Sequence, residues 1–237
     1  MSTLILTGVT APLTPDTHSA THSAIHKKPI KDLVLCTEEG LQGDQQADQR
    51  HHGGSERALH YYPQEHFAYW KGFWQALGLA PSPTLFEPGA FGENLSDSGL
   101  IEEQVHIGDI FTLGEAVIQV SQPRSPCFKL NIRFGYDQMS LVMQTTGKTG
   151  WLFRVLQPGN VKQGDSLKRQ QVAPAGLSVR TCLDTLYNQP YNEGKLRILA
   201  DHPSLSEGWR RHASNWIARG IADDWSRRLF NQADLSD

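Results

Sequence analysis

Short apolar runs separated by turn residues constrain the fold of this 237-residue chain more than any other feature. Between residues 89 and 135, and again between 150 and 168, such runs alternate with Gly, Asp and Pro. Within segments bounded by turn residues, alternation of apolar and polar residues with a period of two is typical of β-strands. Many short strands in succession favour a closed barrel or a sandwich. We therefore predict a mainly β fold, interrupted by one helix near residues 137–144.

Helical periodicity dominates two other parts of the chain. After Pro63, aromatic residues recur at helical spacing as far as Gly78, which predicts an amphipathic helix whose aromatic side faces the core. From residue 173 onward, apolar residues recur at the same spacing and predict three to four short helices. The sequence thus divides into a β-barrel domain over residues 1–172 and a helical domain over residues 173–237.

The N-terminal region carries two further apolar runs, at residues 4–6 and 30–35, which predict strands. They are joined by a polar loop at about residues 12–29. Three histidines recur at every fourth residue of this loop: His18, His22 and His26. On one helical face they could ligate a metal, but the Pro-flanked, Ser/Thr-rich surroundings favour an unstructured loop. We assign no site to them.

The charge balance and the cysteine count exclude several classes of function. With 22 basic and 25 acidic residues, the chain has no basic excess that could neutralise a nucleic-acid backbone. Three cysteines without framework spacing indicate a reducing compartment. The first residues do not resemble a signal peptide, and no apolar run is long enough to span a membrane. We expect a cytoplasmic protein that binds neither nucleic acid nor membrane.

One cysteine lies in a chemically distinctive context, the segment from Gln119 to Asn131. Prolines fix φ on both sides of Arg124 and remove backbone donors, which predicts a stiff, irregular loop that presents Cys127. Arg124 and Lys129 would favour the thiolate, which attacks electrophiles and binds soft metals. A lone cysteine is as often a small buried hydrophobe, so these residues alone leave both interpretations open. Two cysteines in apolar or helical contexts should belong to the core: Cys36 and Cys182.

Two other segments are rich in polar residues that could meet a ligand. In residues 40–59, Gly53 and Gly54 would let the backbone approach a ligand, and Arg57 could bind an anion. The same segment holds four residues that could ligate a metal: Asp44, Asp48, His51 and His52. We favour a structural or supporting role for them, because no fixed histidine pair at i, i+4 is present. In the second segment, Phe-Gly-Glu-Asn-Leu, Asn94 could hydrogen-bond a ligand or form a turn.

Taken in order, these segments resemble the MOSC domain family, named for the C-terminal domain of molybdenum-cofactor sulfurases, and more closely its YiiM-type bacterial members. The resemblance covers about residues 39–167 and includes Gly-Leu-Gln-Gly-Asp-Gln-Gln-Ala-Asp, His-Gly-Gly, Arg-Ala-Leu, Phe-Gly-Glu-Asn-Leu and Gly-Asp-Ile-Phe. Its most specific part is Gln-Val-Ser-Gln-Pro-Arg-Ser-Pro-Cys-Phe-Lys-Leu-Asn, followed by Thr-Gly-Lys-Thr-Gly-Trp. The C-terminal helices resemble the three-helix domain of the same subgroup.

This resemblance implies a MOSC-type β-barrel and a cysteine, here Cys127, that ligates molybdenum in a molybdopterin cofactor. It also implies reduction of N-hydroxylated compounds, such as 6-N-hydroxylaminopurine-type base analogues, to the amine. A separate flavoprotein or other reductase would supply electrons, and two chains could pair as a homodimer. The implied catalytic residues are Cys127, His52 and Asn94. The implied cofactor-binding residues are Arg57, Gln122, Arg124, Lys129 and Lys148.

Two alternatives use the same cysteine. A carrier or binding module would transport the cofactor or a persulfide on Cys127 without turning over a small molecule. A Cys–His hydrolase would use Cys127 as nucleophile, His52 as base and Asn94 as orienting group. No family-specific protease signature surrounds the cysteine, and the sequence does not show that the three residues converge.

Overall fold

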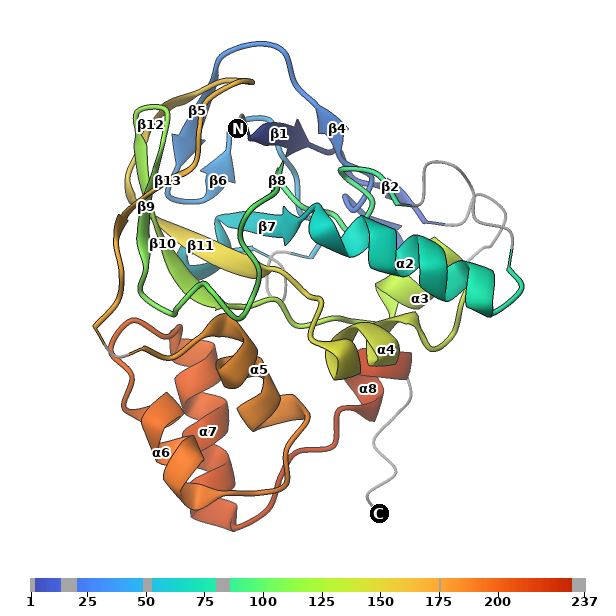
Figure 1. Cartoon of the computed structure of the whole chain (residues 1–237), viewed down its shortest axis with the longest axis vertical. Coiled ribbons are helices and arrows are strands. Elements are labelled where there is room, and N and C mark those ends of the chain that lie inside the picture. The colour runs from blue at the N-terminus through green and yellow to red at the C-terminus, as the bar shows by residue number, and fades with distance from the viewer. Residues whose placement is uncertain (1–2, 14–20, 49–52, 80–85, 175, 232–237) are drawn as a thin grey trace.

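An eight-stranded, curled sheet forms the frame of the molecule (Figure 1). The computed structural model describes residues 3–13, 21–48, 53–79, 86–174 and 176–231. In chain order, the strands of this sheet are β1 (Leu4–Thr7), β4 (Lys28–Pro29), β7 (Leu59–Pro63), β8 (Leu95–Asp97), β9 (Ile110–Leu113), β10 (Ala116–Pro123), β11 (Trp151–Gln157) and β13 (Lys168–Gln171). In space they follow the order β13-β9-β10-β11-β7-β8-β1-β4, and the neighbours pair antiparallel except for the parallel β7 and β8. The mainly β, barrel-type fold predicted from the sequence is confirmed.

Two smaller sheets complete the β structure. One joins β5 (Val34–Thr37), β6 (Gly40–Leu41) and β12 (Gly159–Val161) in the order β12-β5-β6, and the other pairs β2 (Ala11–Pro12) with β3 (His22–Ser23). The strand predicted at residues 30–35 is therefore displaced toward the C-terminus. The predicted loop at 12–29 contains short strands, and no helix occurs within its described residues 21–29. His18 lies outside the described residues.

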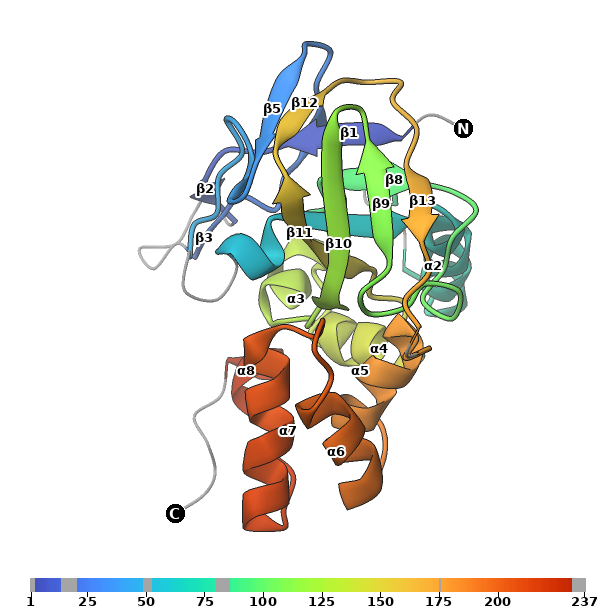
Figure 2. The same ribbon diagram turned by 90° about the vertical axis from the view of Figure 1, so that its left-hand side faces the viewer.

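The helices divide into two groups (Figures 1 and 2). The first, next to the barrel, contains the 3₁₀ turn η1 (Ser55–Arg57), α2 (Glu65–Ala76), α3 (Lys129–Phe134) and α4 (Met139–Thr146). The second, at one end of the barrel, contains α5 (Val179–Tyr187), α6 (Glu193–Ala200), α7 (Glu207–Arg219) and α8 (Ser226–Phe230). The predicted helix after Pro63 is confirmed as α2, whereas α3, which starts two residues after Cys127, was not predicted.

Two apolar cores hold these layers together. One contains alternate residues of the barrel strands, such as Ile118 and Phe153, and continues into the C-terminal helices through Leu183 and Trp209. The other is rich in aromatic residues of α2, of α3 and of the segment before β8, including Trp74 of α2. Because the first core is continuous, α5–α7 are packed as part of the same body as the barrel. None of the helices in the described ranges combines the length and apolar character needed to cross a membrane.

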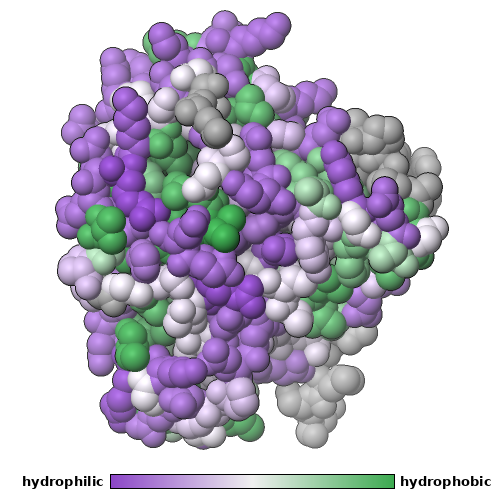
Figure 3. Space-filling model, in the orientation of Figure 1, coloured by the Kyte–Doolittle hydropathy of each residue, from purple (hydrophilic) through white to green (hydrophobic). Residues whose placement is uncertain are grey.

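The surface agrees with this division between core and exterior. Figure 3 shows polar residues over most of one face, with apolar residues in small separate groups. The large apolar side chains that remain exposed include Leu33, Leu156, Ile198 and Ile221, which come from different elements or loops. Scattered apolar residues of this kind are normal on a folded protein and identify no binding surface by themselves.

Candidate functional site

The chain leaves the barrel at the end of β10 and forms the cysteine loop, residues 124–128, before α3 begins. A register shift in the pairing of β10 with β11 between Val120 and Gln122 precedes this exit. Such bulges bend a strand and re-aim the residues that follow. The prediction of an irregular loop between the two prolines agrees with the structure.

Cys127 differs from the other two cysteines in exposure. Its side chain belongs to a partly exposed residue, whereas Cys36 and Cys182 are fully buried in the first core. Burial raises the pKa of Cys36 to about 12 and the pKa of Cys182 well above its ordinary value, so both stay protonated thiols. The prediction that these two cysteines pack in the core is confirmed, whereas Cys127 is a partly exposed residue.

Arg124 places a fixed positive charge beside this thiol. Its guanidinium donates through Nη2 to the carbonyl oxygen of Phe91 at 3.2 Å, and Nη1 lies 3.1 Å from Met143 Sδ. Loss of hydration lowers the pKa of Arg124, and the strongest opposing electrostatic contribution comes from Cys127. Arginine keeps its charge under such conditions, so the loop carries a permanent cation next to a potential thiolate.

Gly150 lets the backbone of β7 come close to the start of β11, next to Arg124. Its φ is +69°, and a Cβ atom here would collide with the carbonyl oxygen of Tyr61. The Gly150 carbonyl accepts from the Arg124 backbone N–H at 3.2 Å. The adjacent His60 is buried, with Nε2 3.3 Å from the Thr149 carbonyl oxygen. Burial, assisted by the charge of Arg124, lowers the pKa of His60 to about 3, so its imidazole is neutral at physiological pH.

Glu93 is a buried carboxyl group that interacts electrostatically with Arg124. The turn before it wraps the side chain, so that Glu93 Oε1 accepts from Gly89 N at 2.5 Å and Oε2 from Phe91 N at 3.0 Å. Burial raises the pKa of Glu93 to about 7, although these N–H groups and Arg124 act in the opposite direction. Two further cations interact electrostatically with Glu93, namely Lys27 and Arg133. We refer to Lys27, Arg124 and Arg133 as the cationic cluster.

The raised pKa of Glu93 predicts a specific pH dependence of stability. Between pH 4.5 and about 7 the unfolded chain releases this proton while the folded chain retains it, so the free energy of unfolding falls as the pH rises. Above the folded-state pKa the free energy of unfolding stops falling, and its total decrease is no more than about 3 kcal/mol. Urea unfolding across this range should show the fall in the wild type and a flatter profile in Glu93→Gln. Glu38→Gln, at an exposed carboxylate, serves as the control and should follow the wild type. Parallel profiles for the wild type and Glu93→Gln would contradict the prediction.

Arg133 has an unsatisfied donor. It lies on α3, loss of hydration lowers its pKa, and its Nε is buried without a hydrogen-bond partner among the described residues. The exposed His26 lies near it, and the pKa of His26 is lowered by loss of hydration and by the charge of Arg133. A buried donor without an acceptor is costly, at about 1–3 kcal/mol. An oxyanion bound next to α3 would provide the missing acceptor.

Lys27 is held in place by Asp44. The two side chains form an ion pair and are only 6% and 1% exposed. Asp44 also accepts from Gly8 N at 2.7 Å and from Asn94 Nδ2 at 2.9 Å. Asn94 Oδ1 accepts in turn from His60 N at 3.1 Å. These bonds engage both ends of the Asn94 amide within the protein, so the contact of Asn94 with a substrate stays a prediction.

Four more residues that the family resemblance implies are Gln122, Lys129, Arg57 and His52. Gln122 is buried in β10, and Lys129 is the partly buried first residue of α3. Arg57 donates through Nε to the carbonyl oxygen of Gly53 at 2.9 Å, and His52 lies outside the described residues. Within the described ranges, no group of three or more His, Cys, Asp or Glu residues is arranged to hold a metal. The preference for a structural role of Asp44 agrees with its ion pair.

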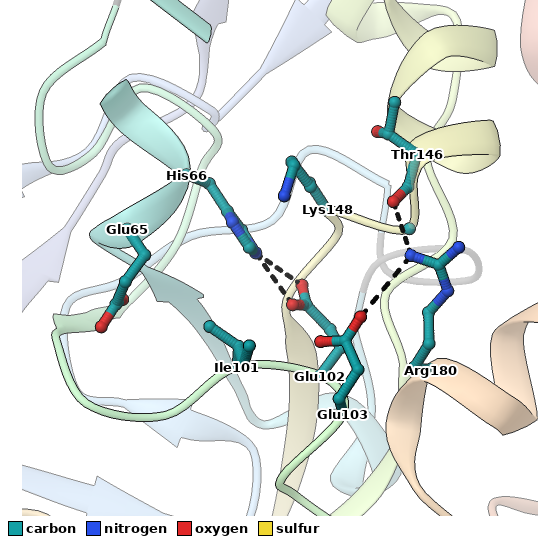
Figure 4. A pocket seen from close by; sticks show the side chains of 9 residues that line it. Glu65, His66, Ile101, Glu102, Glu103, Thr146, Lys148 and Arg180 are labelled. Carbon is teal, nitrogen blue, oxygen red and sulfur yellow. Dashed lines mark hydrogen bonds and ion pairs between the residues drawn. The ribbon is translucent and has the colours of Figure 1, made fainter. Parts of the chain in front are cut away.

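Lys148 lines a separate pocket of about 220 Å³ (Figure 4). The pocket contains the buried pair His66 and Glu102, in which Nε2 lies 2.8 Å from Oε2, and its wall includes Arg180 of α5. Lys148 Nζ lies 4.8 Å from the centroid of the Tyr69 ring. No residue of the cysteine loop lines this pocket, so the structure does not bring Lys148 and Cys127 into one cavity.

Several residues of the site were not predicted from the sequence. Lys27 came from a region interpreted as an unstructured loop, and nothing in its neighbourhood marks it as buried. Arg133 had a signal, because it is the second basic residue after Cys127 in Lys-Leu-Asn-Ile-Arg. Glu93 lies in the Phe-Gly-Glu-Asn-Leu segment, from which only Asn94 was selected. His60 carries no local signal beyond its residue type.

Comparison with known proteins identifies the family. Residues 48–168 match the MOSC domain, and residues 177–220 match the YiiM-like, 3-alpha helix domain. The chain belongs to the YiiM-type MOSC family. It is 40% identical to Protein YiiM of Escherichia coli over 210 residues, which cover 89% of this chain and 91% of that protein. The crystal structure of YiiM from Escherichia coli superposes with a TM-score of 0.77 at 34% identity, over 97% of this chain and 99% of that chain.

The name of a fungal relative indicates a type of reaction. A protein of Gibberella moniliformis named "Reductase" is 42% identical over 146 residues, which are 61% of this chain. The matched part is only 25% of that longer protein. The MOSC segment of our chain therefore resembles a part of a protein that carries a reductase name.

Proposed function

We propose that this protein reduces N-hydroxylated compounds to amines with a molybdenum–molybdopterin cofactor held at Cys127. The observation that carries the proposal is the partly exposed Cys127, which interacts electrostatically with the desolvated guanidinium of Arg124. A soft thiolate suits molybdenum, and the guanidinium of Arg124 would balance its negative charge. The MOSC family and the reductase name of the fungal relative support the same chemistry.

The residues around Cys127 fit such a cofactor. The pterin brings its own dithiolene sulfurs and a phosphate, so it needs a single protein thiolate together with cations that can meet an anion. The cationic cluster offers these cations, and the buried Nε of Arg133 lacks an acceptor that a phosphate oxygen would supply. Lys27 is held rigidly by Asp44, which favours a preorganised site.

Each residue would have a defined role in the reaction R–NHOH + 2 e⁻ + 2 H⁺ → R–NH₂ + H₂O. The bound cofactor would supply the two-electron chemistry that cleaves the N–O bond. Cys127 would hold the metal, Arg124 would balance the thiolate charge, and Arg133 with Lys27 would bind the phosphate. His60 stays uncharged and adds no further positive charge beside Arg124. A separate reductase would return the two electrons.

Metal and pterin analysis combined with turnover tests this proposal. The protein would be purified from cells supplied with molybdate and from cells grown with tungstate, and then assayed with 6-N-hydroxylaminopurine and a reduced viologen dye as electron donor. We expect about one molybdenum and one pterin per chain, and amine formation only in the molybdate sample. Full cofactor binding without turnover would favour a carrier. Loss of the substrate without oxidation of the dye, at equal rates in the two samples, would favour the Cys–His hydrolase.

A further inference from the structure

Helix α8 contacts the cysteine loop on both sides of Cys127. Arg228 Nη1 donates to the carbonyl oxygen of Pro126, and Phe128 N donates to the carbonyl oxygen of Arg228 at 2.8 Å. The two residues that flank the cysteine are therefore both bonded to one residue about a hundred positions later in the chain. Figure 1 shows α8 beside α4, with which it is also in contact.

The Arg228 side chain is itself fixed. Its Nη2 donates to Gln144 Oε1 of α4 at 2.6 Å, and its Cζ lies 4.4 Å from the centroid of the Tyr187 ring and 5.0 Å from that of Trp225. Tyr187 extends the contact, because its hydroxyl lies 2.7 Å from Ser125 Oγ in the cysteine loop. A planar guanidinium can donate to two acceptors while it stacks on aromatic rings, which a lysine ammonium cannot do.

The residue after Arg228 anchors the elements that follow the loop. The Leu229 carbonyl accepts from Asn131 Nδ2 of α3 at 2.8 Å and from Ser140 Oγ of α4 at 2.7 Å. Arg228 and Leu229 lie beyond residues 177–220, the part that matches the three-helix domain. The terminal helix is thus a distinct structural element whose described polar contacts are concentrated on the cysteine loop, α3 and α4.

We propose that Arg228 is a positioning residue for Cys127. With Tyr187, it holds residues 125, 126 and 128, so the backbone around the sulfur has one conformation and presents the thiol beside Arg124. The positioning itself does not depend on the cofactor, whereas its effect on turnover rests on the proposed function.

The alkylation rate of Cys127 in cofactor-free protein tests this role. Iodoacetamide modification would be followed peptide by peptide in the wild type, Arg228→Ala and the control Arg227→Ala, whose side chain is exposed on the same helix. We expect Arg228→Ala to raise the rate at Cys127 about fivefold or more, because local opening exposes the sulfur, and Arg227→Ala to stay within about twofold of the wild type. The buried Cys36 and Cys182 should remain unmodified and thereby report that the fold is intact.

Milder variants keep the proposal testable if Arg228→Ala unfolds. Arg228→Lys retains the charge but loses the planar guanidinium that donates to two acceptors. Tyr187→Phe retains the ring but loses the hydrogen bond to Ser125. We expect both to raise the alkylation rate at least about twofold, with Cys36 and Cys182 still protected. Wild-type alkylation rates in these two variants, or a rate in folded Arg228→Ala equal to that of Arg227→Ala, would overturn the proposal.

The cofactor-loaded protein separates positioning from the proposed function. If both hold, Arg228→Lys should lower kcat about tenfold and leave KM nearly unchanged, because the substrate contacts persist while the thiol is misplaced. A changed alkylation rate in a protein that shows no reductase activity would support the positioning role and count against the reductase. An unchanged alkylation rate together with active wild-type enzyme would support the reductase and count against the positioning role.

Discussion

Replacing Cys127 by serine is expected to lower the rate of N-hydroxylaminopurine reduction by at least about 1,000-fold. The serine hydroxyl stays protonated at neutral pH and is a hard oxygen donor, so it cannot replace a soft thiolate at molybdenum. Because residue 127 is partly exposed, the free energy of unfolding should change by no more than about 0.5 kcal/mol. Steady-state rates, the molybdenum content of the purified variant and urea unfolding measure these three effects.

A buried cysteine provides the matched control. Cys36→Ala removes a fully buried sulfur, so it should destabilise the protein by about 1–2 kcal/mol while the folded enzyme keeps its turnover number. The two variants should therefore show opposite patterns, one affecting activity and the other stability. If Cys127→Ser keeps more than about a tenth of the wild-type activity together with its molybdenum, Cys127 is not the ligand.

Local patterns predicted the elements whose side chains follow a regular period. The barrel strands and α2 were recognised because the buried residues of each recur at a period of two or 3.6. Helix α3 was missed because it has six residues, which is too short for a helical period to stand out from the strand-rich sequence around it. The strand expected at residues 30–35 was displaced because its position depends on pairing with β12, a partner far along the chain.

In the candidate site too, residues close together in the sequence were recognised, whereas residues that pair across long stretches of sequence were not. Cys127 and Arg124 were recognised together because they are three residues apart and the prolines mark their loop. The contact between Arg228 and Pro126 spans 102 residues, and no local pattern indicates it. Lys27 and its partner, Asp44, are 17 positions apart in the sequence, and an apolar run lies between them. Burial of a charge is a property of the assembled fold, so sequence patterns alone identify such residues poorly.

Asp44→Ala is expected to destabilise the protein by about 3–5 kcal/mol, because it leaves the Lys27 ammonium buried without its counter-charge. Loss of hydration already lowers the pKa of Lys27, and Asp44 is the largest contribution that opposes this effect. The substitution also removes the acceptor of the Gly8 and Asn94 donors. Urea unfolding at neutral pH measures the loss, and Asp32→Ala, at an exposed aspartate, should change stability by no more than about 0.5 kcal/mol.

The double variant Lys27→Met, Asp44→Ala separates the ion pair from the other bonds of Asp44. Once the buried ammonium is gone, the loss of the carboxylate leaves neutral donors unsatisfied, those of Gly8, Asn94 and Gln46, so the double variant should be more stable than the sum of the single losses predicts. We expect a coupling energy of about 1–3 kcal/mol from the double-mutant cycle. Strict additivity would mean that water reaches Lys27 when Asp44 is absent. Lys27 would then be a solvated surface lysine in the unpaired state, and the cationic cluster would lose the rigid member on which the phosphate site depends.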